Sequence, residues 1–91
     1  MTINTPIGKI STVKDIGDAV CNARKRMRLK QSQAAQLCGV GVRFLSDLEN
    51  GKETLHIGKV FQVLNGLGLA TYLGPKKPFW TEDGQRPSRL L

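Results

Sequence analysis

The sequence is poor in the residues from which metal sites and enzyme active sites are built. It has two cysteines and a single histidine among 91 residues, and Cys21 and Cys38 do not form a CxxC pair. A zinc site would need ligands from distant places, so we expect no metal and interpret both thiols as small packing residues. No nucleophile–base pair or phosphate loop is present and His56 has no evident partner, which argues against an enzyme and against a cofactor.

Long apolar stretches are also missing. No run approaches the roughly 20 residues of a membrane-spanning helix, and no amphipathic segment carries the bulky apolar face of an interfacial helix. The first residues, MTINTPIGKISTV, lack the basic-then-apolar layout of a signal peptide. We therefore expect a cytoplasmic protein with reduced cysteines and no membrane partner.

Acidic residues are scarce relative to basic ones. The chain has 14 Lys and Arg residues against 7 Asp and Glu residues, which gives a net charge of +7 and an isoelectric point near 9.9. Such a balance favours a polyanionic partner. Because the features of a membrane-binding protein are missing, nucleic acid is the better candidate.

The pattern of apolar and capping residues predicts one small all-α domain. Thr12, with Asp15 three residues later, fits a capping box at the start of a first helix. Residues at helical spacing define its buried stripe: Val13, Ile16, Val20, Ala23 and Met27. The residues opposite and just after it are basic, which is typical of a solvated face but, beside a turn, also of a phosphate-facing one: Arg24, Lys25, Arg26, Arg28 and Lys30.

Three shorter helices should follow. The second is expected to end at Gly39, the third to run from about 42 to 50 with Gly51 as its stop, and the fourth to close at Gly68. The residues expected to face inward are Ala34, Ala35 and Leu37 in the second helix, Phe44, Leu45 and Leu48 in the third, and Ile57, Val60, Phe61, Leu64 and Leu67 in the fourth.

The end of the chain changes character. The stretch LATYLG predicts a brief strand formed by Ala70, Thr71, Tyr72 and Leu73. An isolated strand has nothing to pair with in a helical unit, and a second copy of the chain is its simplest partner. We therefore divide the chain into an N-terminal arm (1–11), the domain (12–74) and a flexible, proline-containing tail (75–91).

The third helix is amphipathic. Projected at about 100° per residue, its apolar residues fall on one arc, and Glu49 lies at the border of that arc. A short polar face suits the major groove of DNA, but an ordinary surface helix has the same periodicity, and periodicity alone does not separate the two. The residues of the polar face are Val42, Arg43, Ser46, Asp47 and Asn50.

The surrounding segment resembles a known family. LKQSQAAQLCGVGVRFLSDLENGK resembles the helix-turn-helix of phage-repressor or XRE-like proteins, and the span from Thr12 to Leu73 is similar to the HipB-like antitoxins. These are small dimeric repressors encoded beside a HipA-type kinase toxin. The resemblance implies an all-α, phage-repressor-like fold of four to five helices, with the C-terminal strand paired across a dimer. The matching positions are Leu29, Gln31, Ala35, Gly39, Val40, Leu45, Ser46, Glu49, Gly51 and Lys52.

The resemblance also implies roles for single residues. Val42, Arg43, Ser46 and Asp47 would face base edges, whereas Lys30, Gln31, Asn50 and Lys52 would contact the DNA backbone. Arg43 is suited to a bidentate contact with guanine, worth about 1–3 kcal/mol of discrimination. Arg24 would pair with Glu49, whose carboxylate lies beside the core and would be costly to leave unpaired.

Two features depart from the family pattern. Lys30 and Gly41 stand where relatives have Ser or Thr at the starts of the second and third helices, and lysine is a poor N-cap. Asp47 is unusual on a face that meets DNA. It would either accept a hydrogen bond from cytosine N4 or weaken binding to wrong sequences.

The function implied is that of a homodimeric repressor of a palindromic double-stranded DNA operator. It would act as an antitoxin that autoregulates its operon and helps to neutralise a HipA-like kinase toxin. Phe79 and Trp80 in the tail would engage the toxin or else fold back on the protein's own core. Two alternatives are a stand-alone XRE-family regulator and a protein-interaction module that has lost DNA binding.

Overall fold

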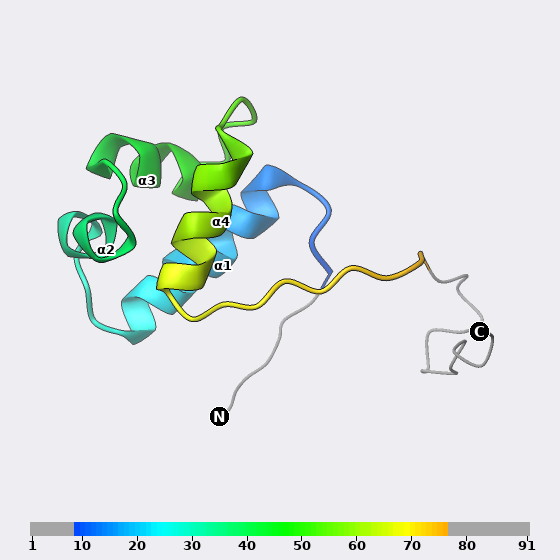
Figure 1. The fold of residues 1–91 in the computed structure, drawn as a ribbon, viewed down its shortest axis with the longest axis horizontal. Helices are drawn as coiled ribbons and strands as arrows, with labels where there is room; N and C mark the ends of the chain where they lie inside the picture. The colour runs from blue at the N-terminus through cyan, green and yellow to red at the C-terminus, as the bar shows by residue number, and fades with distance from the viewer. Residues whose placement is uncertain (1–8, 77–91) are drawn as a thin grey trace.

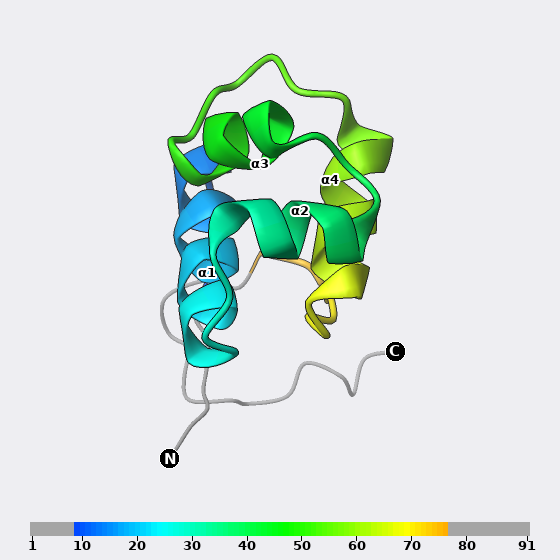
Figure 2. The same cartoon turned by 90° about the vertical axis from the view of Figure 1, so that its left-hand side faces the viewer.

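The computed structural model describes residues 9–76, which form four helices and, within that range, no strand. The helices are α1 (Val13–Arg26), α2 (Gln31–Cys38), α3 (Val42–Glu49) and α4 (Ile57–Gly66). Helix α3 packs on α1 and α2, and α2 also packs on α4 (Figure 1). Seen from the side, α2 and α3 lie in front, with α1 and α4 flanking them (Figure 2). The all-α prediction is confirmed.

Capping side chains fix where α1 begins. The Thr12 hydroxyl accepts a hydrogen bond from the Asp15 backbone N–H at 3.1 Å. The Asp15 carboxylate accepts in return from the backbone N–H groups of Ser11, at 2.8 Å, and Thr12, at 3.1 Å. These two backbone bonds lower the pKa of Asp15. The predicted capping box is confirmed.

The starts of α2 and α3 lack such a side-chain cap, as the sequence indicated. Neither Lys30 nor Gly41 caps its helix with a side chain, but the Gln33 side-chain oxygen accepts from the Lys30 backbone N–H at 2.8 Å. The helix ends follow the predicted glycines. Gly39 ends α2 at φ 74° and Gly51 follows α3 at φ 82°, a left-handed conformation that favours glycine.

The core is small and contains two close helix contacts. Leu45, Leu48, Val20 and Val63 are its largest fully buried side chains. Gly17 of α1 lies directly against the backbone of α3 at Leu48 and Glu49, and Gly66 of α4 lies against Cys38 of α2. Burial raises the pKa of the Cys38 thiol, so this cysteine stays protonated and packs as an apolar group. Cys21 is only half-buried.

Four residues predicted to face the core are exposed. Met27 is the C-cap of α1, beyond the last turn that packs. Leu37 points outward because Ala34 and Cys38, four residues apart on one face of α2, take the inward positions. Ile57 and Phe61 are likewise four residues apart, on the outer face of α4. Val60, Leu64 and Leu67 are buried as predicted, and Val63, which was not predicted, is fully buried with them.

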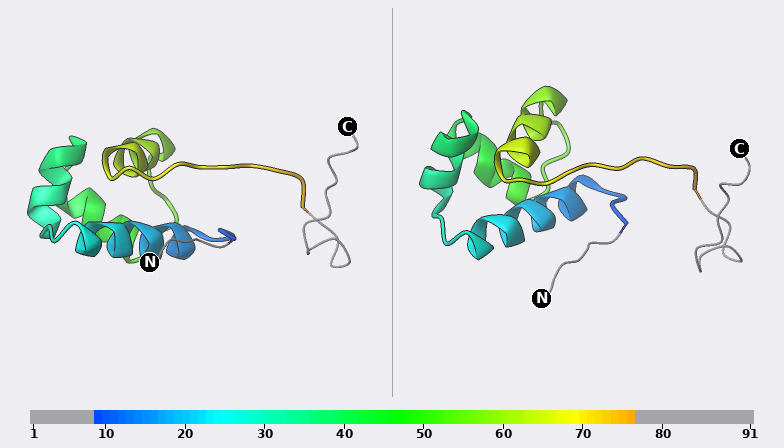
Figure 3. Two further views of the ribbon diagram at one scale, coloured as in Figure 1. Left: turned by 90° about the horizontal axis from the view of Figure 1, so that it is seen from below. Right: turned by 60° about the horizontal axis from the view of Figure 1, so that its bottom comes forward.

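The segment after α4 runs away from α2 and α3 as extended chain (Figure 3). Residues 69–76 have no regular secondary structure in the single chain, and Tyr72 and Leu73 are almost fully exposed. The strand at 70–73 is therefore not formed within one chain, and its pairing across a dimer stays a prediction. Phe79 and Trp80 lie outside the described residues. No helix within 9–76 has the length and apolar character needed to cross a membrane.

Candidate nucleic-acid interface

Helix α3 has one buried face and one exposed polar face. Leu45 and Leu48 are fully buried and Phe44 is half-buried, whereas the residues of the predicted polar face lie at or near the surface. Arg43 and Asn50 are exposed, and Val42 retains 48% of its surface. Ser46 and Asp47 are partly covered. An exposed helix face that carries hydrogen-bonding tips is the shape that enters a major groove.

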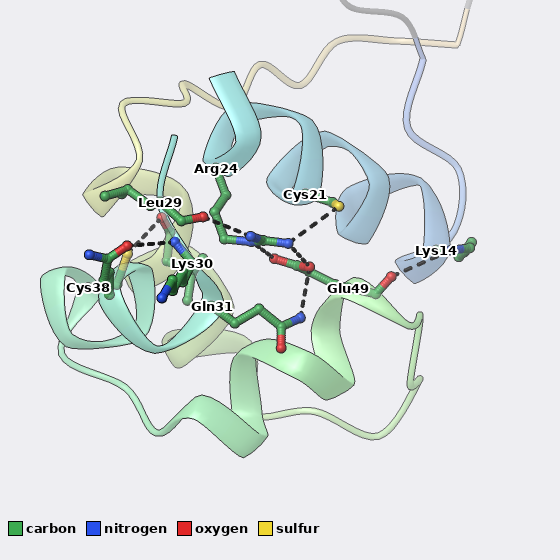
Figure 4. Close-up of polar contacts among 10 residues, drawn as sticks. Lys14, Cys21, Arg24, Leu29, Lys30, Gln31, Cys38 and Glu49 are labelled. Atoms are coloured by element: carbon green, nitrogen blue, oxygen red, sulfur yellow. Dashed lines mark hydrogen bonds and ion pairs between the residues drawn. The ribbon is translucent and has the colours of Figure 1, made fainter. Parts of the chain in front are cut away.

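A buried ion pair holds α3 from behind. Arg24 of α1 meets Glu49 of α3 in a bidentate arrangement, with Nε 2.7 Å from Oε2 and Nη2 2.9 Å from Oε1. The third guanidinium nitrogen, Nη1, donates to the Leu29 carbonyl at 2.8 Å, so the same side chain also fixes the loop before α2 (Figure 4). The Arg24 and Glu49 side chains are 12% and 7% exposed, which makes this a protected pair rather than a surface contact.

Gln31 joins this network from α2. Its side-chain nitrogen donates to Glu49 Oε1 at 3.0 Å (Figure 4). Because an amide nitrogen carries two hydrogens, one remains for the phosphate contact that the sequence resemblance implies. Burial by itself raises the pKa of Glu49, but the hydrogen bonds from Arg24 and Gln31 outweigh it and hold that pKa below its ordinary value. The carboxylate is therefore ionised at neutral pH and ties three helices together.

Three contacts near this network were missed by the sequence reasoning. The Lys14 ammonium lies 3.5 Å from the Glu49 carbonyl (Figure 4). It also lies 3.0 Å from the Asp18 carboxylate. A cation at the last carbonyls of a helix is favourable, so Lys14 supports the C-terminal end of α3. Cys21 Sγ lies 3.8 Å from Arg24 Nη2. The Lys14–Glu49 contact is not visible in the sequence, because it depends on how α1 crosses α3. The other two contacts form within α1, between residues three and four positions apart.

The polar face of α3 has its own charge cluster. Asp47 lies 3.5 Å from Arg43 Nε through one carboxylate oxygen and 3.7 Å from Lys52 Nζ through the other. The structure thus brings a predicted base-reading arginine and a predicted backbone-contacting lysine to one carboxylate. Asn50 and Lys52 follow the end of α3, and Lys30 lies exposed at the start of α2.

The remaining predicted sites are not gathered at this face. Residues 70–73 lie on the extended segment that leaves the domain away from α2 and α3 (Figure 3), and the aromatic pair of the tail is outside the described residues. Within residues 9–76, no three His, Cys, Asp or Glu side chains come together as a metal-binding group.

Comparisons with known proteins agree with this geometry. The helix-turn-helix (HTH_3) family model matches residues 22–72, more than half of the chain. The chain is 52% identical over 62 residues to the uncharacterized HTH-type transcriptional regulator y4mF of Sinorhizobium fredii (strain NBRC 101917 / NGR234), a match that covers 68% of this chain and 82% of that protein.

Solved structures share the fold. A HipB–O4 20mer complex is 24% identical, with a TM-score of 0.71, and the match covers 78% of this chain and all of that one. A HipA–HipB–O2–O3 complex is also 24% identical, with the same coverage and a TM-score of 0.70. The family match, the four-helix fold and the braced, exposed third helix together place this chain in the XRE-type helix-turn-helix family, with a HipB-like fold.

Proposed function

We propose that this protein is a sequence-specific transcriptional repressor that inserts α3 into the major groove of double-stranded DNA. The observation that carries the proposal is the exposed polar face of α3 held from behind by the buried Arg24–Glu49 pair. A rigid support fixes where the reading side chains lie, which a base-specific contact requires. Two similar proteins support the same conclusion, an HTH-type transcriptional regulator and the HipB of a HipB–O4 20mer complex.

The residues divide into readers and phosphate contacts. Arg43, whose side chain is 85% exposed, would donate to a guanine. Val42 would touch a thymine methyl, and Ser46 would hydrogen-bond a base edge. Phosphates would be bound by residues at the start of α2 and at the end of α3, which are Lys30, Gln31, Asn50 and Lys52.

Separate variants test this division. In an operator selected from a randomised duplex library, Arg43→Ala should cost about 1–3 kcal/mol of discrimination at one base pair of each half-site, because a bidentate base contact is lost. Lys52→Ala should weaken binding to all sequences alike and reduce the salt dependence by about one counterion per chain, because a phosphate contact is lost. Fluorescence anisotropy at several salt concentrations measures both. Unchanged selectivity in Arg43→Ala would remove Arg43 from the readout.

The same function requires two copies of the chain. The exposed segment 70–73 presents Tyr72 and Leu73 to solvent, at 88% and 96% exposure, and its backbone makes no hydrogen bond to the rest of residues 9–76. Pairing of this segment with its copy would give its backbone groups hydrogen-bond partners and form a two-stranded ribbon. Two α3 helices related in this way would read a palindromic operator with half-sites about one helical turn apart.

Tyr72→Pro tests the dimer. Proline removes a backbone donor from a strand and fixes φ, so the variant should be monomeric by light scattering and bind a single half-site more weakly. Tyr72→Thr is the control, because it keeps the donor and a strand-compatible side chain while removing the ring. A dimer that persists in Tyr72→Pro would place the interface elsewhere.

We further infer a role as a cytoplasmic antitoxin that autoregulates its operon and neutralises a HipA-like kinase. Support comes from the fold shared with the HipB of a HipA–HipB complex and from Phe79 and Trp80, an aromatic pair suited to anchor a partner. The test is co-purification with a kinase encoded beside its gene, using the full chain and a chain lacking residues 75–91. If both chains recover the same amount of kinase, the tail is not the kinase-binding segment. If no such kinase is encoded beside the gene, the protein is a stand-alone regulator.

A further inference from the structure

Asp47 lies between the two cations of the polar face of α3. Its side chain is 24% exposed, whereas those of Arg43 and Lys52 are 85% and 51% exposed. The carboxylate is therefore the innermost of the three charged groups. One oxygen is 3.5 Å from Arg43 Nε and the other is 3.7 Å from Lys52 Nζ, so both oxygens are directed at neighbours in the same chain.

The geometry leaves the outer edge of Arg43 available. Arg43 and Asp47 are one helical turn apart, and the contact is made through Nε. A guanidinium is planar, so an acid at Nε restrains the plane while the two terminal nitrogens remain available. Those terminal nitrogens are suited to guanine O6 and N7.

Lys52 contacts Asp47 in two ways. Its backbone N–H donates to the Asp47 carbonyl at 3.0 Å, across the turn that contains Gly51. Its ammonium then faces the Asp47 carboxylate. One residue of α3 therefore fixes both the path of the chain after the helix and the side chain that would contact a phosphate.

Direct base reading by Asp47 fits these contacts less well. To accept from cytosine N4, the carboxylate would have to reach past two longer side chains and give up its cations. In free protein, exposed pairs of this kind contribute little to stability. Beside DNA, where water is displaced, the same pairs become stronger.

We propose that Asp47 is a positioning residue that orients Arg43 and Lys52 on the DNA-reading face, and that it raises base discrimination while lowering affinity for unrelated DNA. This inference rests on the proposed DNA-binding function. The affinity loss follows from the negative charge, which repels phosphates wherever the sequence is wrong and Arg43 finds no base to bind.

The experiment compares Asp47→Ala and Asp47→Asn with Arg43→Ala and the Arg43→Ala/Asp47→Ala double variant. Each is titrated with the selected operator, with operators changed at one base pair, and with unrelated duplex. Asp47→Ala should lose about five-fold or more in discrimination at the base pair that Arg43 reads, while it binds unrelated DNA more tightly. Asp47→Asn should behave like Asp47→Ala, since asparagine keeps the size of the aspartate side chain but not its charge. The double variant should discriminate no worse than Arg43→Ala.

Glu53→Ala is the matched control. Glu53 is an exposed acid just after Lys52, and it takes part in none of the ion pairs among residues 9–76. Its loss removes the same charge from the same region without touching Arg43. It should raise affinity for unrelated DNA and leave discrimination among operators unchanged.

Three results would overturn the inference. Asp47→Ala could keep the discrimination of the wild type although Arg43→Ala loses it. The losses of discrimination in Asp47→Ala and Arg43→Ala could instead be additive and occur at different base pairs, which would mean that Asp47 contacts a base itself. Asp47→Ala could also bind every DNA more weakly with a lower melting temperature, which would make its role structural. If the wild type itself prefers no sequence, the proposed function fails and this inference with it.

Discussion

Gly17→Ala is expected to lower the free energy of unfolding by about 3 kcal/mol, at the upper end of the range for overpacked cores. A Cβ at this position would lie 2.1 Å from the Leu48 carbonyl oxygen and 3.1 Å from both Cα and O of Glu49. These are backbone atoms of α3, which cannot rotate away as a side chain can. The two helices must therefore move apart, and the buried side chains between α1 and α3 lose contact. In a domain of this size the melting temperature should fall by on the order of 15 °C.

The sign of this effect separates packing from helix propensity. Alanine is favoured over glycine in a helix interior by about 1 kcal/mol, so without the close contact Gly17→Ala would stabilise α1. Gly74→Ala is the control, since a Cβ there meets nothing within 4 Å, and it should leave the melting temperature unchanged. Circular dichroism on heating measures both. A Gly17→Ala protein that melts at or above the wild-type temperature would contradict the close approach of α1 and α3.

Arg24→Met is expected to destabilise the domain by about 3–5 kcal/mol, the cost of leaving a buried charge without its partner. Glu49 would keep the hydrogen bond from Gln31 but lose two bonds from the guanidinium, and the Leu29 carbonyl would lose its donor as well. Since small domains are marginally stable, the variant should be partly unfolded at 37 °C. Its DNA binding should fall with the folded fraction.

Matched variants show whether the buried charge is the cause. Lys25→Met removes a neighbouring exposed cation and should change the unfolding free energy little. Arg24→Met/Glu49→Leu removes both charges and should recover most of the loss, because well-packed apolar residues can replace a buried pair. Urea unfolding at pH 7 gives all three values. A double variant as unstable as Arg24→Met would mean that lost packing, not an unpaired carboxylate, is responsible.

The same pair predicts a pH dependence. The folded-state pKa of Glu49 lies below its ordinary value, because the bonds from Arg24 and Gln31 outweigh the opposing effect of burial. Its contribution is therefore fully present above the ordinary glutamate range and is lost as the pH falls through the folded-state pKa. In Arg24→Met, burial acts with only Gln31 opposing it and the carboxylate takes up a proton more readily. The stability gap between variant and wild type should narrow from pH 7 to pH 3.

Some of the helix boundaries could be read from local signals. Thr12 with Asp15 marks the start of α1, and Gly39 and Gly51 mark the ends of α2 and α3, because capping and left-handed turns depend on residues near in sequence. The Arg24–Glu49 pairing was available only through the family resemblance, since the two residues are 25 positions apart.

The sequence predicted less well which residues of a short helix face the core. The exposure of Leu37 and Phe61 depends on the rotation of α2 and α4 about their axes, and two or three turns of mixed residues fit more than one rotation.

Taken by itself, the sequence determined the helical architecture, the position of the polar face on α3 and the excess of positive charge, since each depends on residue type and local spacing. Only the tertiary structure decided the rest. Gly17 gives no sign in the sequence that the backbone of α3 lies against it. The second partner of Asp47 becomes visible only when the turn at Gly51 brings Lys52 back to the helix. Such contacts arise from how helices cross and how turns close, and these are properties of the packed chain rather than of any one segment.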